Sequence, residues 1–295
     1  MKYLIASFHI QCADNLAQIA KDLLADIAGE AGFESFEDTD QGLNGYVQET
    51  LIDQPTLDTG LQAFPIADVH ITYTLSPAED RDWNEQWEQQ GFEPIHIASR
   101  IVVYDARSTQ YPDIAPHEMP IAIEARQAFG TGTHETTRMV IGALIDAQPA
   151  TKRVLDCGCG TGILSIAAAL LGASSCIGYD IDEWSVANTR HNAALNGVEC
   201  LEALHGDIQV AEQITGTFDI VMANIHRNII LADMPRLAAK MAPCATLIIS
   251  GFYTADIPLL CNRASECGLT HAATHSEEPW ACLVFRKETS QTPLT

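Results

Sequence analysis

Basic residues are scarce in this chain. Its 295 residues include 16 Lys and Arg against 39 Asp and Glu, which gives a formal net charge of -23 at pH 7. Residues 1–75 alone hold 12 acidic residues and 2 basic ones. Such a field repels nucleic acid and attracts a basic protein, although it also serves solubility alone. We therefore expect no direct nucleic-acid binding, and a lysine-rich protein is a candidate partner.

Long apolar runs and paired cysteines are also missing. No stretch reaches transmembrane length, and polar Gln11, Asp14 and Asn15 follow the first apolar run too soon for a secretion signal. The nine cysteines are an odd, scattered set, which argues against a disulfide framework. Cys157 and Cys159 have no CxxC partner or His cluster to complete a metal site. We expect a cytoplasmic monomer without membrane contact or metal.

A glycine turn stands near the middle of the sequence. Residues 154–168 read VLDCGCGTGILSIAA, a buried strand followed by a turn and a helix, which is typical of nucleotide-cofactor loops. The glycines are Gly158, Gly160 and Gly162. Ile163 stands where an NAD-binding loop needs a third glycine, and Asp156 would repel a pyrophosphate. S-adenosylmethionine is cationic and has no phosphate, so it suits this turn; a plain tight turn is the alternative.

Two further strands end near an acidic residue. Residues 175–179 precede Asp180, about twenty residues after the glycines, where a carboxylate can accept from both ribose hydroxyls. Asp182 opens the next helix, so the alternative is that Asp180 merely caps it. Further on, a strand ends at His205, and Asp207 is either an acceptor for the adenine amino group or a plain turn residue.

Asn224 follows a fourth strand, expected at residues 219–223. The strand delivers it to the carboxyl end of the sheet, where ligands bind in open α/β folds. An Asn side chain offers an acceptor and two donors but no charge. This suits an amine nucleophile, whose protons need an acceptor while its lone pair faces a methyl group. The alternative is that Asn224 caps the helix that follows.

The first 75 residues predict the order strand, helix, strand, strand, helix, strand, which is the split βαβ, ferredoxin-like pattern. The expected elements are strands at 2–10, 33–37, 46–51 and 69–75, helices at 14–28 and 55–64, and a turn at 42–45. This part has no cofactor loop and no reactive cluster. It is therefore interpreted as a recognition module.

The rest of the chain divides into a connecting segment and a larger domain. A polar helix over 79–92 carries Trp83 and Trp87 on one face, and strands at 96–104 and 120–124 follow it. After Asn224 we expect helices at 228–240 and 257–267 and strands at 245–250, 269–275 and 281–286, the last two forming an edge hairpin. The expected domains are 1–76 for substrate recognition, 77–126 as linker and 127–295 for cofactor binding.

Taken together, these motifs resemble a known family. VLDCGCGTG, GYDID and the strand ending at Asn224 resemble the class I S-adenosylmethionine methyltransferases. Within that class, DWNEQW, FGTGTHETTR and MANI resemble the bacterial methyltransferases of large-subunit ribosomal protein eleven, over nearly the whole chain. The resemblance implies a doubly wound α/β, Rossmann-like sheet, mostly parallel with a C-terminal antiparallel hairpin, and a smaller α+β ferredoxin-like N-terminal domain. It implies cofactor contacts at Thr137, Gly158, Asp180 and Asn224.

FGTGTHETTR, residues 129–138, gains a role from this resemblance. Gly130 and Gly132 permit an irregular backbone. The hydroxyl and imidazole groups expected to close over the methionine end of the cofactor belong to Thr133, His134, Thr136 and Thr137. A metalloprotease HExxH is excluded, because Arg138 stands where the second His belongs. The alternative is that Thr136 or Thr137 caps a helix over 138–147.

The resemblance also implies the reaction, methylation of lysine side chains, the N-terminal α-amine, or both, in ribosomal protein eleven. A lysine with a pKa near 10.4 is mostly charged at pH 7, so the enzyme must help to uncharge it. Asn224 is expected to orient the amine. Two departures from the family pattern are Glu135 for the usual Pro and His226 for an aliphatic residue. The alternatives are another protein or small-amine substrate, or a non-catalytic cofactor-binding module.

Overall fold

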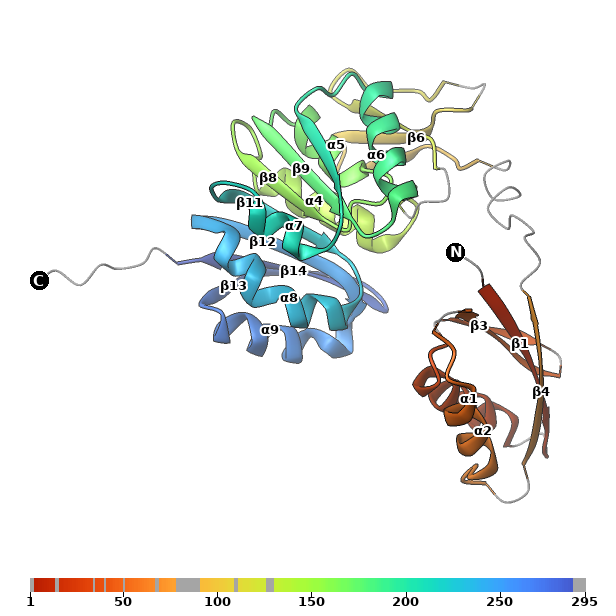
Figure 1. The fold of residues 1–295 in the computed structure, drawn as a ribbon. Helices are drawn as coiled ribbons and strands as arrows, with labels where there is room; N and C mark the ends of the chain where they lie inside the picture. Colours follow the sequence, from red (N-terminus) through yellow and green to blue (C-terminus); the bar gives the residue numbers. More distant parts are fainter. Residues whose placement is uncertain are drawn as a thin grey trace, which may run out of the picture. The chain divides into compact units, whose positions relative to one another are not determined.

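The computed structural model describes most of the chain (Figure 1). The described residues are 3–13, 16–33, 35–39, 41–49, 51–66, 69–77, 91–108, 111–125 and 130–288. They belong to two compact units, Met1–Trp83 and Asn84–Thr295. Trp83 and Trp87, and with them most of the helix expected at 79–92, lie outside the described residues.

The first unit is a four-stranded antiparallel sheet with two helices on one face (Figure 1). Its elements are β1 (Tyr3–Gln11), α1 (Ala17–Glu30), β2 (Ser35–Thr39), β3 (Gly42–Gln48), α2 (Gln54–Gln62) and β4 (His70–Pro77). The strand order is β2-β3-β1-β4. Phe8 of the sheet packs with Leu24 of α1 and Leu57 of α2 in one core. The predicted ferredoxin-like order is confirmed.

The turn expected at 42–45 is wrong, because these residues begin strand β3. Gly42 already pairs with Thr39 of β2, and the strand continues through Gly45. A Cβ atom on Gly45 would lie 2.9 Å from the Phe33 ring and 3.1 Å from that of Phe8. The glycine therefore marks a position where aromatic rings cover the strand closely, rather than a reversal of the chain.

A separate three-stranded sheet begins the second unit. Its strands are β5 (Ile95–Ile97), β6 (Ile101–Asp105) and β7 (Met119–Ile123), in the order β5-β6-β7. The single strand expected at 96–104 is wrong. The chain reverses at Ala98 and Ser99, both at φ 50°, and β5 pairs back antiparallel on β6. Ile101 and Ile121 of these strands pack into the same core as the large sheet.

The large sheet has seven strands in the order β10-β9-β8-β11-β12-β14-β13. They are β8 (Arg153–Cys157), β9 (Ser175–Asp180), β10 (Leu201–His205), β11 (Phe218–Asn224), β12 (Met241–Tyr253), β13 (Leu269–Glu277) and β14 (Trp280–Lys287). The first five in this order are parallel, and β14 runs antiparallel to both its neighbours. The doubly wound sheet with a C-terminal hairpin is therefore confirmed. Strand order reverses between β8 and β11, where such sheets bind ligands at their carboxyl ends.

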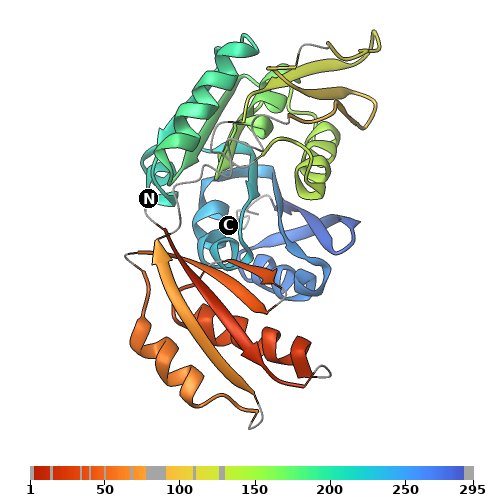
Figure 2. The same ribbon diagram turned by 90° about the vertical axis from the view of Figure 1, so that its right-hand side faces the viewer.

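Helices cover both faces of this sheet (Figures 1 and 2). They are α4 (Glu135–Asp146), α5 (Ile163–Leu170), α6 (Glu183–Leu195), α7 (Ile208–Gln213), α8 (Arg227–Lys240) and α9 (Ile257–Glu266), with a 3₁₀ turn η2 (Thr254–Asp256). Neighbouring strand residues face opposite sides of the sheet: Val154 belongs to the core that includes α4 and α5, and Leu155 to the core that includes α8 and α9. Burial on both faces explains why the strands read as continuous apolar runs. No helix in the described part is both long and apolar enough to cross a membrane.

Candidate active site

The glycine turn is held by the end of strand β9. The N–H groups of Gly158 and Cys159 both donate to the Tyr179 carbonyl, at 2.8 and 3.0 Å. The Gly160 N–H donates to Asp180 Oδ2 at 2.9 Å. These contacts fix the turn between β8 and α5 against the neighbouring strand, at the carboxyl end of the sheet.

Asp156 lies beneath this turn and is almost completely buried, with 1% of its surface exposed. Ser165 of α5 donates to Asp156 Oδ2 at 2.7 Å. Among the described residues, Oδ1 has no hydrogen-bond partner. Burial raises the pKa of Asp156 to about 7, and the negative charge of Asp180 adds to this rise. One carboxyl oxygen therefore stays available to a cation or donor entering from the turn.

Asp180 ends strand β9 and organises the turn itself. Besides accepting from Gly160, it accepts from the Asp182 N–H through Oδ1 at 3.1 Å. The cap of α6 is Asp182, which accepts from the N–H groups of Trp184 and Ser185. The alternative that Asp180 is this helix cap is therefore wrong. Each of its oxygens has one described partner and a second lone pair for further donors.

Asn224 ends strand β11 beside the glycine turn. Its neighbour Ile225 contacts the turn so closely that a Cβ on Gly158 would lie 2.4 Å from Ile225 Cγ2. The cap of α8 is His226, whose ring accepts from the Asn228 N–H at 3.4 Å, so Asn224 is not the cap. Within the described part of the chain, no hydrogen bond of the Asn224 side chain is present. Its amide is therefore uncommitted at the carboxyl end of the sheet.

The two loops singled out in the sequence touch each other. The Thr161 hydroxyl, in the glycine turn, donates to the Gly130 carbonyl at 2.5 Å. Gly132 lies so close to Ile163 that a Cβ there would come within 3.1 Å of Ile163 Cδ1. Residues about thirty positions apart in sequence are thus in contact, and this contact places the start of α4 beside the glycine turn.

Helix α4 begins at Glu135, earlier than expected, because His134 is its cap. The His134 ring accepts from the Thr136 N–H at 3.2 Å and lies 2.9 Å from the Thr136 hydroxyl. Thr137 is equally buried, at 1% exposed, but its hydroxyl has no partner among the described residues. Thr133 is exposed and pairs with Thr131 at 2.8 Å. Of the loop residues, Thr137 therefore has the buried, unsatisfied group that a ligand can use.

Three aromatic rings form a row at the same end of the sheet. The Trp280 ring lies 4.7 Å from that of His134 and 4.6 Å from that of Tyr253, centroid to centroid. Tyr253 follows Ser250, the residue paired with Asn224 on the neighbouring strand. Tyr253 is 50% exposed, so the row offers an open aromatic face at this end of the sheet.

Comparison with known proteins decides the family. A family model for the ribosomal protein L11 methyltransferase (PrmA) matches residues 16–288. The chain belongs to this family. The ribosomal protein L11 methyltransferase of Bacteroides fragilis is 44% identical over 286 residues, which are 97% of this chain and 99% of the relative. That of Bacteroides thetaiotaomicron is 43% identical over 288 residues, with the same coverage.

A solved structure of the L11 methyltransferase family shares the fold. The ribosomal protein L11 methylase of Lactobacillus delbrueckii subsp. bulgaricus is 25% identical, with a TM-score of 0.62 over 67% of this chain and 100% of that chain. The family expected from VLDCGCGTG, FGTGTHETTR and MANI is thereby confirmed. DWNEQW lies outside the described residues.

A row of three asparagines supports the site and is not among the motifs singled out in the sequence: Asn188 and Asn192 on α6, and Asn196 at its C-terminal cap. Asn192 donates to the Thr161 carbonyl of the glycine turn at 2.9 Å, and Thr189 donates to the Gly160 carbonyl at 2.9 Å. The four-residue spacing of these asparagines was visible in the sequence. Asparagine is a poor helix former that prefers caps and turns, so its repetition inside a helix signals specific hydrogen bonds.

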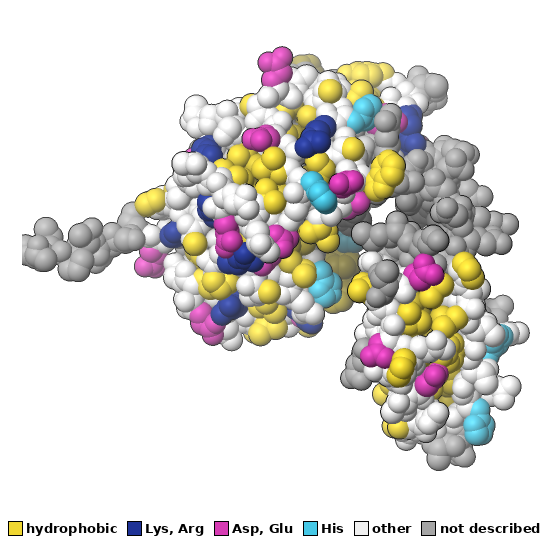
Figure 3. All heavy atoms as spheres, in the orientation of Figure 1, with side chains coloured by type: hydrophobic (Ala, Val, Ile, Leu, Met, Phe, Trp, Pro, Cys, Tyr) yellow, Lys and Arg dark blue, Asp and Glu magenta, His cyan; other side chains and the backbone are white. Residues whose placement is uncertain are grey.

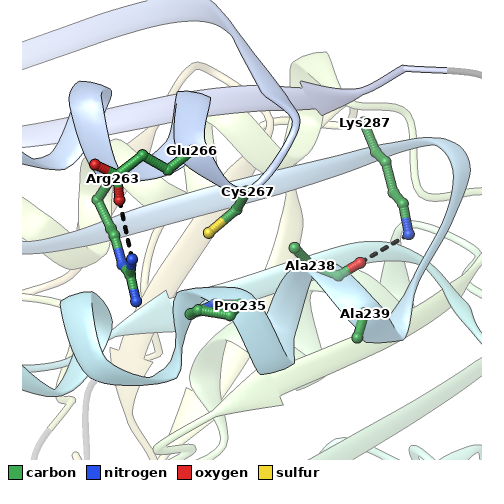
Figure 4. A pocket seen from close by; sticks show the side chains of 7 residues that line it. All are labelled: Pro235, Ala238, Ala239, Arg263, Glu266, Cys267 and Lys287. Atoms are coloured by element: carbon green, nitrogen blue, oxygen red, sulfur yellow. Dashed lines mark hydrogen bonds and ion pairs between the residues drawn. The ribbon is translucent and has the colours of Figure 1, made fainter.

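One predicted residue serves as a helix cap, and one pocket lies away from the site. Asp207 caps α7 by accepting from the Gln209 N–H at 2.8 Å, which leaves its adenine role a prediction. A pocket of about 370 Å³ lies between α8, α9 and the last residue of β14, at the opposite end of the sheet (Figure 4). There Lys287 donates to the Ala238 carbonyl, and Arg263 pairs with Glu266. Arg263 also donates to the Leu231 carbonyl of α8 at 3.1 Å, so both cations are already used in structural contacts.

Burial explains the cysteines of the family turn. Cys157 is fully buried and Cys159 is 4% exposed. Burial raises the pKa of Cys159 to about 12, so the thiol stays protonated and unreactive. Small apolar thiols thus fill the space behind the turn. Among the described residues no group of three potential metal ligands occurs.

Proposed function

We propose that this chain transfers the methyl group of S-adenosylmethionine to amino groups of ribosomal protein L11, in lysine side chains, at the N-terminal α-amine, or both. The observation that carries the proposal is the set of uncommitted polar groups at the carboxyl end of the sheet. Two of these are buried, Asp156 Oδ1 and the Thr137 hydroxyl, and the third is the half-buried Asn224 amide. A buried polar atom without a partner is costly, so such atoms point to a ligand that satisfies them.

The chemistry of these groups fits S-adenosylmethionine. All three groups can accept hydrogen bonds; Asp156 lies beneath the glycine turn and Asn224 beside it. A phosphate would require Lys or Arg, and neither is among these groups. We assign Thr137, Asp156 and Asn224 to the methionine end and Asp180 to the ribose hydroxyls. The turn at Gly158, Gly160 and Gly162 passes close to the cofactor, and the exposed Thr133 has the weakest claim to a contact. When bound, the cofactor supplies a methyl group on a positively charged sulfur.

Asn224 gives the site its preference for an amine. The amide carbonyl accepts one N–H of an uncharged amine and so points the nitrogen lone pair at the methyl carbon. The N–C bond forms as the S–C bond breaks, and the surplus proton of the product leaves to water. Desolvation in the site favours the uncharged amine over the ammonium. Alignment and desolvation thus supply most of the acceleration.

The aromatic row of His134, Trp280 and Tyr253 provides the approach for this amine. An ammonium or methylated ammonium is attracted to an aromatic face, with Trp the strongest of the side chains. The half-exposed Tyr253 and the Trp280 ring behind it can hold the incoming lysine before it loses its proton.

We assign recognition of the protein substrate to the N-terminal unit, residues 1–76, joined by a linker over 77–126 to a cofactor-binding part over 127–295. On the face shown in Figure 3, the coloured side chains of this unit include Asp and Glu but no Lys or Arg. Lys21 is paired with Asp38 at 2.7 Å. An acidic module attracts a basic ribosomal protein and repels nucleic acid. We place the enzyme in the cytoplasm, acting as a monomer.

The direct test uses labelled cofactor. The chain is incubated with methyl-labelled S-adenosylmethionine and the ribosomal proteins of a strain lacking this activity, and the labelled band is identified. The proposal expects label in L11, on amino groups. Label in another protein would contradict the substrate, and bound cofactor without transfer to any protein would contradict the enzymatic function.

A further inference from the structure

Strand β7 has β6 on one side, and on the other side it meets a helix instead of a strand. The Ala122 N–H donates to Asn196 Oδ1 at 2.8 Å, and Asn196 Nδ2 donates back to the Ala122 carbonyl at 2.7 Å. The Glu124 N–H donates to Asn192 Oδ1 at 3.0 Å, and Asn188 Nδ2 donates to the Glu124 carbonyl at 2.8 Å. The asparagines of α6 and its C-terminal cap thus pair with Ala122 of β7 and with Glu124, the next residue but one, as a neighbouring strand would.

The spacing explains why the row works. Four residues of a helix rise about 6 Å, and two residues of a strand about 6.6 Å. Asn196 and Asn192 therefore meet the alternate residues Ala122 and Glu124, whose N–H and C=O groups face the same edge, and Asn188 bonds the remaining carbonyl of Glu124. Figures 1 and 2 show α6 beside the three-stranded sheet that contains β7.

Asn192 differs from the other two because it also reaches the glycine turn. Its Oδ1 accepts from Glu124, while its Nδ2 donates to the Thr161 carbonyl at 2.9 Å. The side chain is completely buried. The Thr161 hydroxyl in turn holds the Gly130 carbonyl. The glycine turn is therefore attached to the preceding part of the chain at two points, at Glu124 through Asn192 and at Gly130 through Thr161.

We propose that Asn192 is a positioning residue that locks the cofactor turn to the end of strand β7, at Glu124. A planar amide holds its donor and acceptor at a fixed separation, so a shift of β7 moves the Thr161 carbonyl with it. The affinity of the turn for its cofactor then depends on a strand that lies before the cofactor-binding part in sequence. The inference rests on the proposed use of the turn as the S-adenosylmethionine site.

Asn192→Ala and Asn196→Ala form a matched pair of variants. Both remove hydrogen bonds from α6 to β7, and Asn192→Ala alone also frees the Thr161 carbonyl. S-adenosylmethionine binding is measured by calorimetry without protein substrate. We expect Asn192→Ala to bind about tenfold more weakly and Asn196→Ala within about twofold of the unaltered chain. Equal losses in both, or no loss in Asn192→Ala, would overturn the inference.

Hydrogen exchange separates positioning from a merely structural role. Without cofactor, Asn192→Ala should exchange faster than the unaltered chain both in peptides over 119–125 and in peptides over 158–166. Asn196→Ala should do so only over 119–125. If the exchange over 158–166 is unchanged in Asn192→Ala, the turn is not held by Asn192 and the inference fails.

The unaltered chain gives a further measurement that does not depend on a variant folding. Adding S-adenosylmethionine should slow exchange over 119–125 as well as at the turn, and slowing confined to the turn would contradict the coupling. A chain that does not bind S-adenosylmethionine at all would refute the proposed function. The cofactor-free exchange of the two variants would still decide the inference.

Discussion

Replacement of Thr137 by Val should make the empty protein more stable and its cofactor binding weaker. The Thr137 side chain is 1% exposed, and its hydroxyl has no partner among the described residues. Val has nearly the same shape and the same branching in a helix, so packing is kept. Leaving a buried hydroxyl unsatisfied costs about 1–3 kcal/mol, so its removal should raise the free energy of unfolding by about 1–2 kcal/mol.

The binding of S-adenosylmethionine should change in the opposite direction. If the cofactor satisfies this hydroxyl, Thr137→Val loses that hydrogen bond and binds about tenfold more weakly, since about 1.4 kcal/mol corresponds to a factor of ten. The midpoint of thermal unfolding, measured with and without cofactor, reports both the change in stability and the change in cofactor affinity. For a unit of this size, 1 kcal/mol moves the midpoint by about 2–4 °C.

Thr136→Val is the matched control. Thr136 is equally buried and adjacent, but its hydroxyl lies 2.9 Å from His134 Nδ1 in the helix cap. The control should therefore lose stability by about 1 kcal/mol and keep its cofactor affinity. The reasoning is refuted if Thr137→Val is destabilised like Thr136→Val, or if it binds the cofactor as tightly as the unaltered chain.

Three further predictions concern the same end of the sheet. Gly158→Ala should lower both the midpoint of thermal unfolding and the cofactor affinity, because the φ of Gly158 is +74° and the new methyl group would lie 2.4 Å from Ile225. In a double-mutant cycle, Ile225→Ala should restore part of both losses. Strictly additive effects of the two substitutions would contradict the contact. Burial raises the pKa of Asp156 to about 7, so between about pH 4 and 7 the native state keeps a proton that the unfolded state loses. The free energy of unfolding should therefore fall as the pH rises from about 4 to 7, and Asp156→Asn should remove roughly 4 kcal/mol of that fall. Parallel pH profiles of the variant and the unaltered chain would contradict this prediction. Trp280→Ala and Tyr253→Ala should raise the KM for the protein substrate several-fold with cofactor affinity unchanged, and an unchanged KM would remove the aromatic row from the approach of the amine.

The sequence was a good guide wherever one local pattern decides the structure. Strands β9 and β11 were recognisable because an apolar run ends in a polar residue, Asp180 or Asn224, at the carboxyl end. The turn after β8 was recognisable because its glycines follow a buried strand. These signals depend on neighbours in sequence, so they survive without knowledge of the tertiary fold.

Long-range contacts limited the other predictions. Gly45 looks like a turn residue, but it is in a strand because the aromatic rings of Phe8 and Phe33 cover it. The start of α4 was placed late because His134 is not among the preferred caps, and its ring takes that role beside Trp280. Asn192 acts through Glu124 and Thr161, which lie 68 and 31 residues away in sequence. The four-residue spacing of the asparagines indicates specific hydrogen bonds, but it does not reveal which distant residues are the partners.

The central claim is amine methylation of L11 at the carboxyl end of the sheet, with Asn224 orienting the amine. Mass spectrometry of purified, unmethylated L11 tests it most directly, after incubation with S-adenosylmethionine and either the unaltered chain or Asn224→Ala, each at saturating cofactor. The account predicts that the unaltered chain adds whole methyl groups at amines, and that Asn224→Ala binds the cofactor but adds them at least about tenfold more slowly. Unmodified L11, or equal rates from both proteins, would contradict it.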